Sequence, residues 1–121
     1  MVPPLFLGVL VTDLAYFMTH EVQWKNFASW MLVGALVFSG IAMVWAIADW
    51  LRPSADRSAQ RSIYVILLVA LWVLGCFNSL VHAADAWGSM PDGLILSSIL
   101  VAVSLAATWL GFSHCRARVA A

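Results

Sequence analysis

The chain has few charged residues. Only 10% of its 121 residues are Asp, Glu, Lys or Arg and 64% are hydrophobic, whereas a soluble domain is about a quarter charged and half apolar. Six acidic and six basic side chains give a formal net charge of +0, so no overall positive field is available to attract nucleic acid. This composition excludes a nucleic-acid-binding protein and places the chain in the membrane class.

Cysteine is scarce as well. Cys76 lies within one apolar segment and Cys115 lies just past the end of another, so we expect no disulfide between them. No Lys or Arg precedes the first apolar run, and no small-residue cleavage site follows it. We therefore expect the N-terminal segment to stay in the membrane and not to be removed as a signal peptide.

Motifs of soluble enzymes are also missing. The sequence has no nucleophile–base pair, phosphate-binding loop or Gly-rich fingerprint, so we expect that the protein is not an enzyme. The metal-like pairs are His82 with Asp85 and His114 with Cys115. Neither pair gathers the three or four ligands that a zinc or iron site requires, and we expect no bound metal.

Four long apolar runs are present, over residues 2–19, 27–51, 63–82 and 94–113. Each is close to the length of about 17–25 residues that a spanning helix needs, and the runs are too long and continuous for barrel strands. Pro53 and Pro91 stand in two of the short connections, where they favour helix ends and turns. Residues 1–121 therefore predict a single all-α transmembrane domain of four helices.

Small and weakly polar side chains recur every three or four residues in each run. Packing drives the association of membrane helices, and small side chains let their backbones approach, so this heptad-like spacing predicts a compact, left-handed four-helix bundle. The predicted contact faces comprise Gly8, Thr12, Ala15 and Thr19; Ala35, Ser39, Ala42, Ala46 and Asp49; Gly75, Ser79 and His82; and Ser97, Ser104, Thr108, Gly111 and Cys115.

The placement of arginine predicts the orientation of the bundle. Arg52, Arg57 and Arg61 occupy the second connection, and Arg116 and Arg118 follow the fourth run. By the positive-inside rule, the second connection and both termini are cytoplasmic.

Asp13 is an acid inside an apolar run, where an ionised carboxylate costs about 2.5–3.5 kcal/mol or more. It must face the bundle interior, be protonated or have a partner. One interpretation is a proton or ion transporter that uses Asp13 as a relay. We favour a structural acid that is hydrogen-bonded by Thr12, Asn78 or a serine of the fourth helix such as Ser97, because the inner half of the bundle offers few further titratable groups.

Asp49 lies three residues before Arg52 at the end of the second run. We expect a boundary ion pair between them, which contributes about 0–1 kcal/mol.

His20 and His82 stand at the outer ends of the first and third runs. Two histidines on facing helices of a bundle can be the axial ligands of haem iron, so a haem-b electron carrier is an alternative function. We favour His82 as an inward hydrogen-bond partner of Asp13 or Asn78, and accordingly expect no cofactor.

Several segments together resemble a known family. They are GVLVTDLAY at 8–16, WKNFASWMLVGALVFSGIAMVWAIADWL at 24–51, PDGLILSSI at 91–99 and WLG at 109–111. In order and spacing the chain is similar, over nearly its whole length, to a bacterial family of predicted four-helix inner-membrane proteins. That family is catalogued as domain of unknown function twenty-two thirty-one.

The family pattern has acids at the positions of Asp13 and Asp49 and an Asn at Asn78. The chain departs from it near Tyr64, where a family histidine is replaced, and at His82, which stands in place of a basic residue. Family members lie near, or are fused to, Rieske iron–sulfur domains and quinoprotein dehydrogenases. The resemblance thus implies a small non-catalytic subunit or partner in a larger membrane assembly or homo-oligomer, of a redox or respiratory kind.

Overall fold

The protein is a bundle of long helices. The computed structural model describes residues 2–53, 58–84, 88 and 90–120. In these ranges it contains α1 (Val2–Thr19), α2 (Val22–Leu51), α3 (Ala59–Ala83) and α4 (Asp92–Ala120). Each helix is long and apolar enough to cross a membrane, so the chain is an all-α membrane protein whose surface contacts lipid. Arg57 and Asp85 lie outside the described residues.

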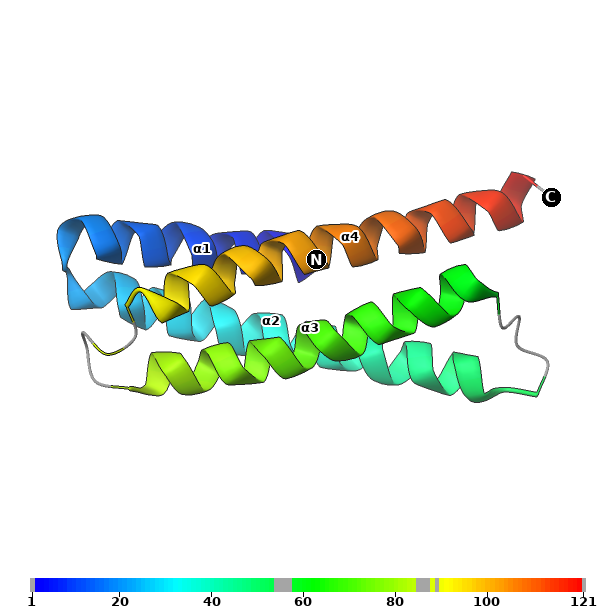
Figure 1. Cartoon of the computed structure of the whole chain (residues 1–121), viewed down its shortest axis with the longest axis horizontal. Coiled ribbons are helices and arrows are strands. Elements are labelled where there is room, and N and C mark those ends of the chain that lie inside the picture. Colours follow the sequence, from blue (N-terminus) through cyan, green and yellow to red (C-terminus); the bar gives the residue numbers. More distant parts are fainter. Residues whose placement is uncertain (1, 54–57, 85–87, 89, 121) are drawn as a thin grey trace.

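The four helices form a square in cross-section. Helix α1 packs against α2 and α4, and α3 packs against the same two helices, so α1 and α3 stand diagonally across the bundle axis. Consecutive helices run antiparallel (Figure 1). A side chain that joins α1 to α3 must therefore pass through the centre of the bundle.

Helix α1 is much shorter than its neighbours. It has 18 residues, whereas α2 has 30 and α4 has 29. Its N-terminal end lies partway along the bundle, beyond which α2, α3 and α4 continue together (Figure 1). Among the described residues, α1 lies along one half of the bundle, and α2, α3 and α4 extend into the other half (Figure 1).

The helices extend beyond the apolar runs that predicted them. Helix α2 begins at Val22 and not at residue 27, and α4 continues to Ala120, well past residue 113. An apolar run marks the part of a helix that contacts hydrocarbon. The backbone hydrogen bonds of a helix continue through polar residues such as Lys25 and Arg116, so helix ends predicted from hydropathy alone fall short.

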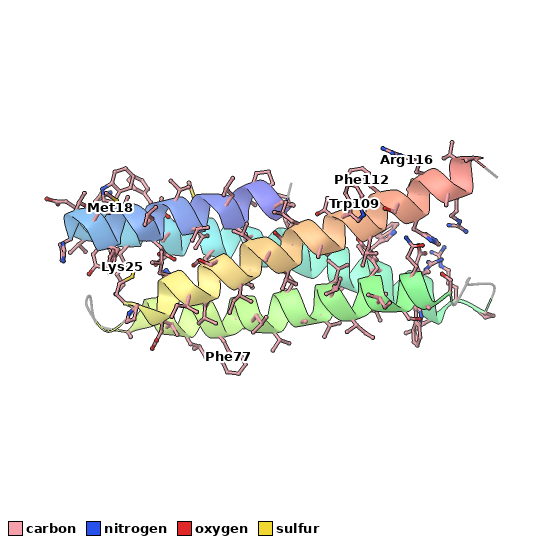
Figure 2. All side chains as sticks on the ribbon, turned by 45° about the horizontal axis from the view of Figure 1, so that its top comes forward. Met18, Lys25, Phe77, Trp109, Phe112 and Arg116 are labelled. Atoms are coloured by element: carbon pink, nitrogen blue, oxygen red, sulfur yellow. The ribbon has the colours of Figure 1, made fainter. Side chains whose placement is uncertain are left out.

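The core is narrow and the exterior is apolar. Phe6, Leu32, Leu71 and Leu100 are almost completely buried between the helices. Large apolar side chains also cover the outside, as Figure 2 shows for Phe77, which points away from the bundle and is 58% exposed. An exterior of this kind is stable in hydrocarbon and not in water.

The predicted contact faces are correct in the middle of the helices and wrong at two ends. Seven of the predicted residues are buried between helices: Thr12, Ala35, Ser39, Gly75, His82, Ser97 and Ser104. Thr19 and Cys115 are exposed. Thr19 is the last residue of α1 and Cys115 lies near the C-terminal end of α4, so both lie away from the packed middle of the bundle.

Candidate functional site

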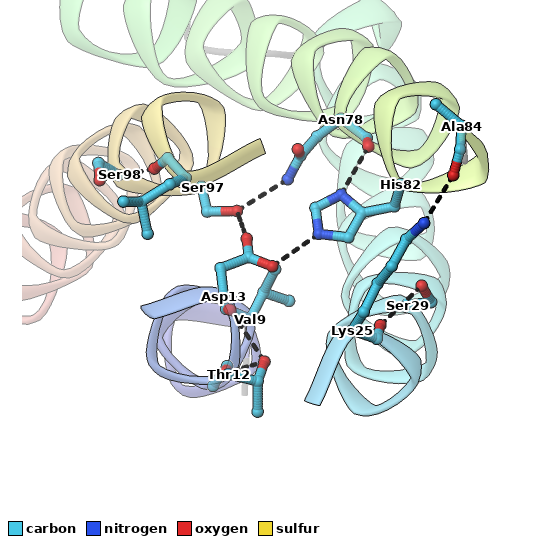
Figure 3. A network of polar contacts seen from close by, with 12 residues as sticks. Val9, Thr12, Asp13, Lys25, Ser29, Asn78, His82, Ala84, Ser97 and Ser98 are labelled. Atoms are coloured by element: carbon cyan, nitrogen blue, oxygen red, sulfur yellow. Dashed lines mark hydrogen bonds and ion pairs between the residues drawn. The ribbon is translucent and has the colours of Figure 1, made fainter. Parts of the chain in front are cut away.

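The centre of the half of the bundle along which α1 lies contains a polar network built around Asp13 of α1. Asp13 is 0% exposed, and both of its carboxylate oxygens have a partner (Figure 3). Oδ1 lies 2.7 Å from Nε2 of His82, and Oδ2 accepts a hydrogen bond of 2.5 Å from Oγ of Ser97. The network therefore joins α1 to its diagonal partner α3 and to its neighbour α4.

The atoms that the two ring nitrogens of His82 contact determine which nitrogen carries a hydrogen. Nδ1 lies 2.9 Å from the carbonyl oxygen of Asn78, and a carbonyl oxygen can only accept, so Nδ1 carries a hydrogen. One further hydrogen lies between Nε2 and Oδ1 of Asp13. The pair is then either imidazolium with carboxylate or neutral imidazole with carboxylic acid, and its net charge is zero in both arrangements.

Asn78 and Ser97 complete the network. Nδ2 of Asn78 donates to Oγ of Ser97 at 3.0 Å, and the hydroxyl hydrogen of Ser97 goes to Asp13. Oδ1 of Asn78 is buried with no partner among the described residues. Lys25 lies nearby but donates to the carbonyl oxygen of Ala84 at 2.6 Å.

Helical spacing explains why these side chains meet. Asn78 and His82 are four residues apart in α3, and residues at that spacing share one face of a helix. Gly93 and Ser97 repeat the spacing in α4. A Cβ atom at Gly93 would lie 3.2 Å from Cε1 of His82, so glycine lets the start of α4 come close to the imidazole ring.

Thr12 does not join the network, although the sequence indicated it as a partner of Asp13. Its hydroxyl lies 2.8 Å from the carbonyl oxygen of Gly8 and 2.9 Å from that of Val9. A threonine in a helix commonly makes such bonds to the preceding turn. The structure instead supplies His82 and Ser97, two of the partners that the sequence also favoured.

The geometry does not favour haem ligation by His20 and His82. Both ring nitrogens of His82 already face oxygen atoms, those of Asp13 and Asn78, so iron would have to displace one of them. His20 is exposed in the turn after α1, with a φ of 60°. Within the described residues, no group of three or more His, Cys, Asp or Glu side chains is placed to hold a metal ion.

Asp49 lies toward the opposite end of the bundle. Its Oδ1 is 3.2 Å from Nη1 of Arg52, the partner predicted from the sequence, and its Oδ2 is 3.5 Å from Nη2 of Arg61. The Arg52 side chain is 66% exposed and that of Arg61 is 13% exposed. The second, more buried arginine fixes the end of α2 to the start of α3.

Helix α4 also carries a row of small residues on its outer face, which was not identified from the sequence. Ser98, Ala102 and Ala106 are four residues apart, and all three are exposed on the outside of the bundle. We call these three residues the outer small-residue stripe. The spacing of four is visible in the sequence, but the inward-facing Ser97 and Ser104 share the same helix, and only the packed structure separates the two faces.

Comparison with known proteins identifies the type of chain. A family model described as a predicted membrane protein, DUF2231, matches residues 4–116. Neither the curated proteins nor the solved structures give a match.

Proposed function

Because the chain belongs to the DUF2231 family of predicted membrane proteins, we propose that it is a non-catalytic subunit or partner of a larger assembly in the bacterial inner membrane. The outer small-residue stripe is the observation that carries this proposal. Ser98, Ala102 and Ala106 are exposed on the outside of the bundle, where a second protein can reach them. Repeated small residues at a spacing of four let the backbone of another membrane helix approach closely.

The chemistry of the stripe fits a helix–helix contact. The Ser98 hydroxyl donates to the carbonyl oxygen of Leu94 at 2.9 Å, so its hydrogen is already bonded and the stripe can enter an apolar interface. Large exposed side chains flank the stripe, among them Ile95, Ile99 and Leu105. A groove of small residues between such ridges is the shape into which a second helix packs.

The Asp13 network supports a structural role for the buried polar residues. Asp13 is bonded both to His82 of its diagonal partner α3 and to Ser97 of its neighbour α4. Proton transport across the membrane would need further titratable groups in sequence along the axis. The network instead holds three helices together and leaves the outer face of α4 for contact with another protein.

The redox or respiratory character of the assembly is the finer part of the proposal. Its support is the resemblance to a family whose members accompany iron–sulfur and quinoprotein enzymes. It is tested by the absorption spectrum, reduced minus oxidised, of the assembly isolated with this chain. A spectrum without bands from haem, flavin or iron–sulfur partners would exclude the redox role. It would not contradict the proposal that the chain is part of a larger assembly.

The assembly is tested by substitution within the stripe. We expect the wild-type chain, extracted from its own membranes in a mild detergent, to migrate on a native gel well above its mass of 13.2 kDa. Ala102→Leu should release most of it at lower mass, because leucine keeps the approaching backbone away. Ala48→Leu is the matched control, since Ala48 is exposed on α2, away from the stripe.

Two results would contradict the proposal. One is a wild-type chain that migrates alone. The other is an Ala102→Leu chain that stays assembled as fully as the Ala48→Leu chain. The helical circular dichroism of both variants should equal that of the wild type, which separates loss of assembly from loss of folding.

A further inference from the structure

A cleft opens in the half of the bundle that α1 does not reach. Asp13 of α1 and Ser97 of α4 lie at the same level along the bundle axis, because they share a hydrogen bond. Helices α1 and α4 run antiparallel. Helix α1 begins eleven residues before Asp13, so its end is level with the residue eleven after Ser97, which is Thr108. Beyond that level, α2, α3 and α4 line a cleft of about 440 Å³, and no residue of α1 lines it. This volume is within the range of about 300–1,000 Å³ that is typical of ligand pockets.

The cleft has the depth of one leaflet of a bilayer. Its wall on α2 runs from Phe38 to Asp49, which at a rise of about 1.5 Å per residue is about 16 Å. The hydrocarbon core is about 30 Å thick. Asp49 and Arg61 mark the ends of the apolar parts of α2 and α3, so the cleft reaches from the membrane surface to about the bilayer midplane.

The deep part of the cleft is apolar and its mouth is basic. Phe38, Ile41 and Val65 line the wall, whereas Arg61 and Arg118 lie with Asp49 at the other end. Asp49 is paired with Arg61 and also with Arg52. Arg118 has no acidic partner among the described residues, so its positive charge is uncompensated within the part of the chain that the structure describes.

A histidine in the same lining has an unused hydrogen-bonding atom. His114 lines the cleft, and its Nε2 is buried without a partner among the described residues. Buried polar atoms nearly always have a partner in native structures. An oxygen atom of a bound molecule would supply one.

We propose that this cleft holds a single anionic phospholipid. One acyl chain lies along the apolar wall, and the phosphate lies at the mouth, where Arg118 attracts it and Nε2 of His114 donates to it. Basic pockets between membrane helices on the cytoplasmic side recognise anionic head groups in this way. The arginine distribution predicts that this end of the bundle is cytoplasmic, the leaflet whose surface is negative.

Other occupants fit the cleft less well. Helix α1 lies in line with the cleft along the bundle axis. A partner helix that filled the cleft and crossed the whole bilayer would therefore collide with α1. An uncharged ligand would leave the positive charge of Arg118 unused. The inference does not rest on the proposed assembly, because the outer small-residue stripe does not line the cleft.

The test is native mass spectrometry of the full chain. The purified protein is given phosphatidylglycerol or phosphatidylcholine with identical acyl chains. We expect one phosphatidylglycerol to stay bound under activation that removes phosphatidylcholine. Arg118→Gln should lower this preference about fivefold, which corresponds to about 1 kcal/mol for one arginine near an anionic head group. Ala42→Phe, which fills the apolar wall, should remove both lipids.

Arg116→Gln is the matched control, because Arg116 is exposed on the same helix and does not line the cleft. It should keep the preference for phosphatidylglycerol. Equal retention of the two lipids by the wild type, or an equal effect of the two arginine substitutions, would overturn the inference. Displacement of phosphatidylglycerol by inorganic phosphate alone would also overturn it, since it would identify a site for a soluble anion. Arg118 is exposed, so its substitution tests binding without unfolding the bundle.

Discussion

Asp13 has two partners with different hydrogen-bonding roles. Ser97 donates to Oδ2, whereas Nε2 of His82 shares one hydrogen with Oδ1. An asparagine can reproduce both contacts, because its oxygen accepts from Ser97 and its amide donates to the lone pair on Nε2 of neutral His82. Hydrogen bonding therefore requires a polar side chain at position 13 and does not require a charge there.

We predict that Asp13→Asn keeps the stability of the bundle and that Asp13→Leu lowers it. Leucine would leave His82 and Ser97 buried without their partners, at a cost of about 1–3 kcal/mol for each group. The free energy of unfolding, measured by titration with a denaturing detergent, should separate the two variants. A relay would give a different result, an Asn variant that is fully folded and assembled yet inactive in the cell.

At the residue scale, the sequence predicted which residues belong to the Asp13 network better than it predicted which of them hydrogen-bond to one another. A buried acid needs partners, and His82 and Ser97 were among the few polar groups at a similar depth. The sequence did not exclude Thr12, because whether a threonine bonds to its own helix or across the bundle depends on its rotamer. The close approach of Gly93 to His82 depends on backbone packing, for which a lone glycine gives no signal.

At the scale of single helices, each helix has one face toward the core and one toward lipid. In α2, Ala35 is 0% exposed while Val37, two residues later, is 55% exposed. The small-residue pattern predicted the inner face because packing of membrane helices requires close backbones. It could not predict the outer small-residue stripe of α4, since the same residue types with the same spacing occur on both faces of that helix.

We predict that Ala35→Leu destabilises the bundle by about 1–3 kcal/mol, because a larger side chain overpacks a filled core. Val37→Leu on the same helix should change the free energy of unfolding by less than about 0.5 kcal/mol. The midpoints of detergent-induced unfolding give both values. Equal midpoints for the two variants would show that α2 is not packed as the structure describes.

At the scale of the whole molecule, the unequal lengths of the helices determine the shape. The sequence predicted four spanning helices, because long apolar runs have few alternatives in a membrane. It did not predict the cleft, because the packing of the helices decides which side chains of α2, α3 and α4 line it. The hydrogen bond between Asp13 and Ser97 fixes how α1 is aligned with α4, and no pattern within a single run encodes that alignment.

The orientation of the molecule remains a prediction from a handful of arginines, and cysteine labelling tests it. In a chain without Cys76 and Cys115, we expect Ala59→Cys to be labelled only from the cytoplasm and Glu21→Cys from the opposite side. Both positions are exposed. The reverse pattern would place the mouth of the cleft in the outer leaflet and the Asp13 network toward the cytoplasm.

The long sequence separations within the network have a consequence for biosynthesis. His82 follows Asp13 by 69 residues and Ser97 follows it by 84. At a synthesis rate of roughly 5–20 residues per second, the ribosome reaches Ser97 roughly 4–17 seconds after Asp13. Until His82 and Ser97 have both been made, the first helix carries an acid that lacks at least one of these partners. Until the third and fourth helices arrive, Asp13 must therefore enter the membrane protonated or be sheltered by the translocation machinery or by water within it.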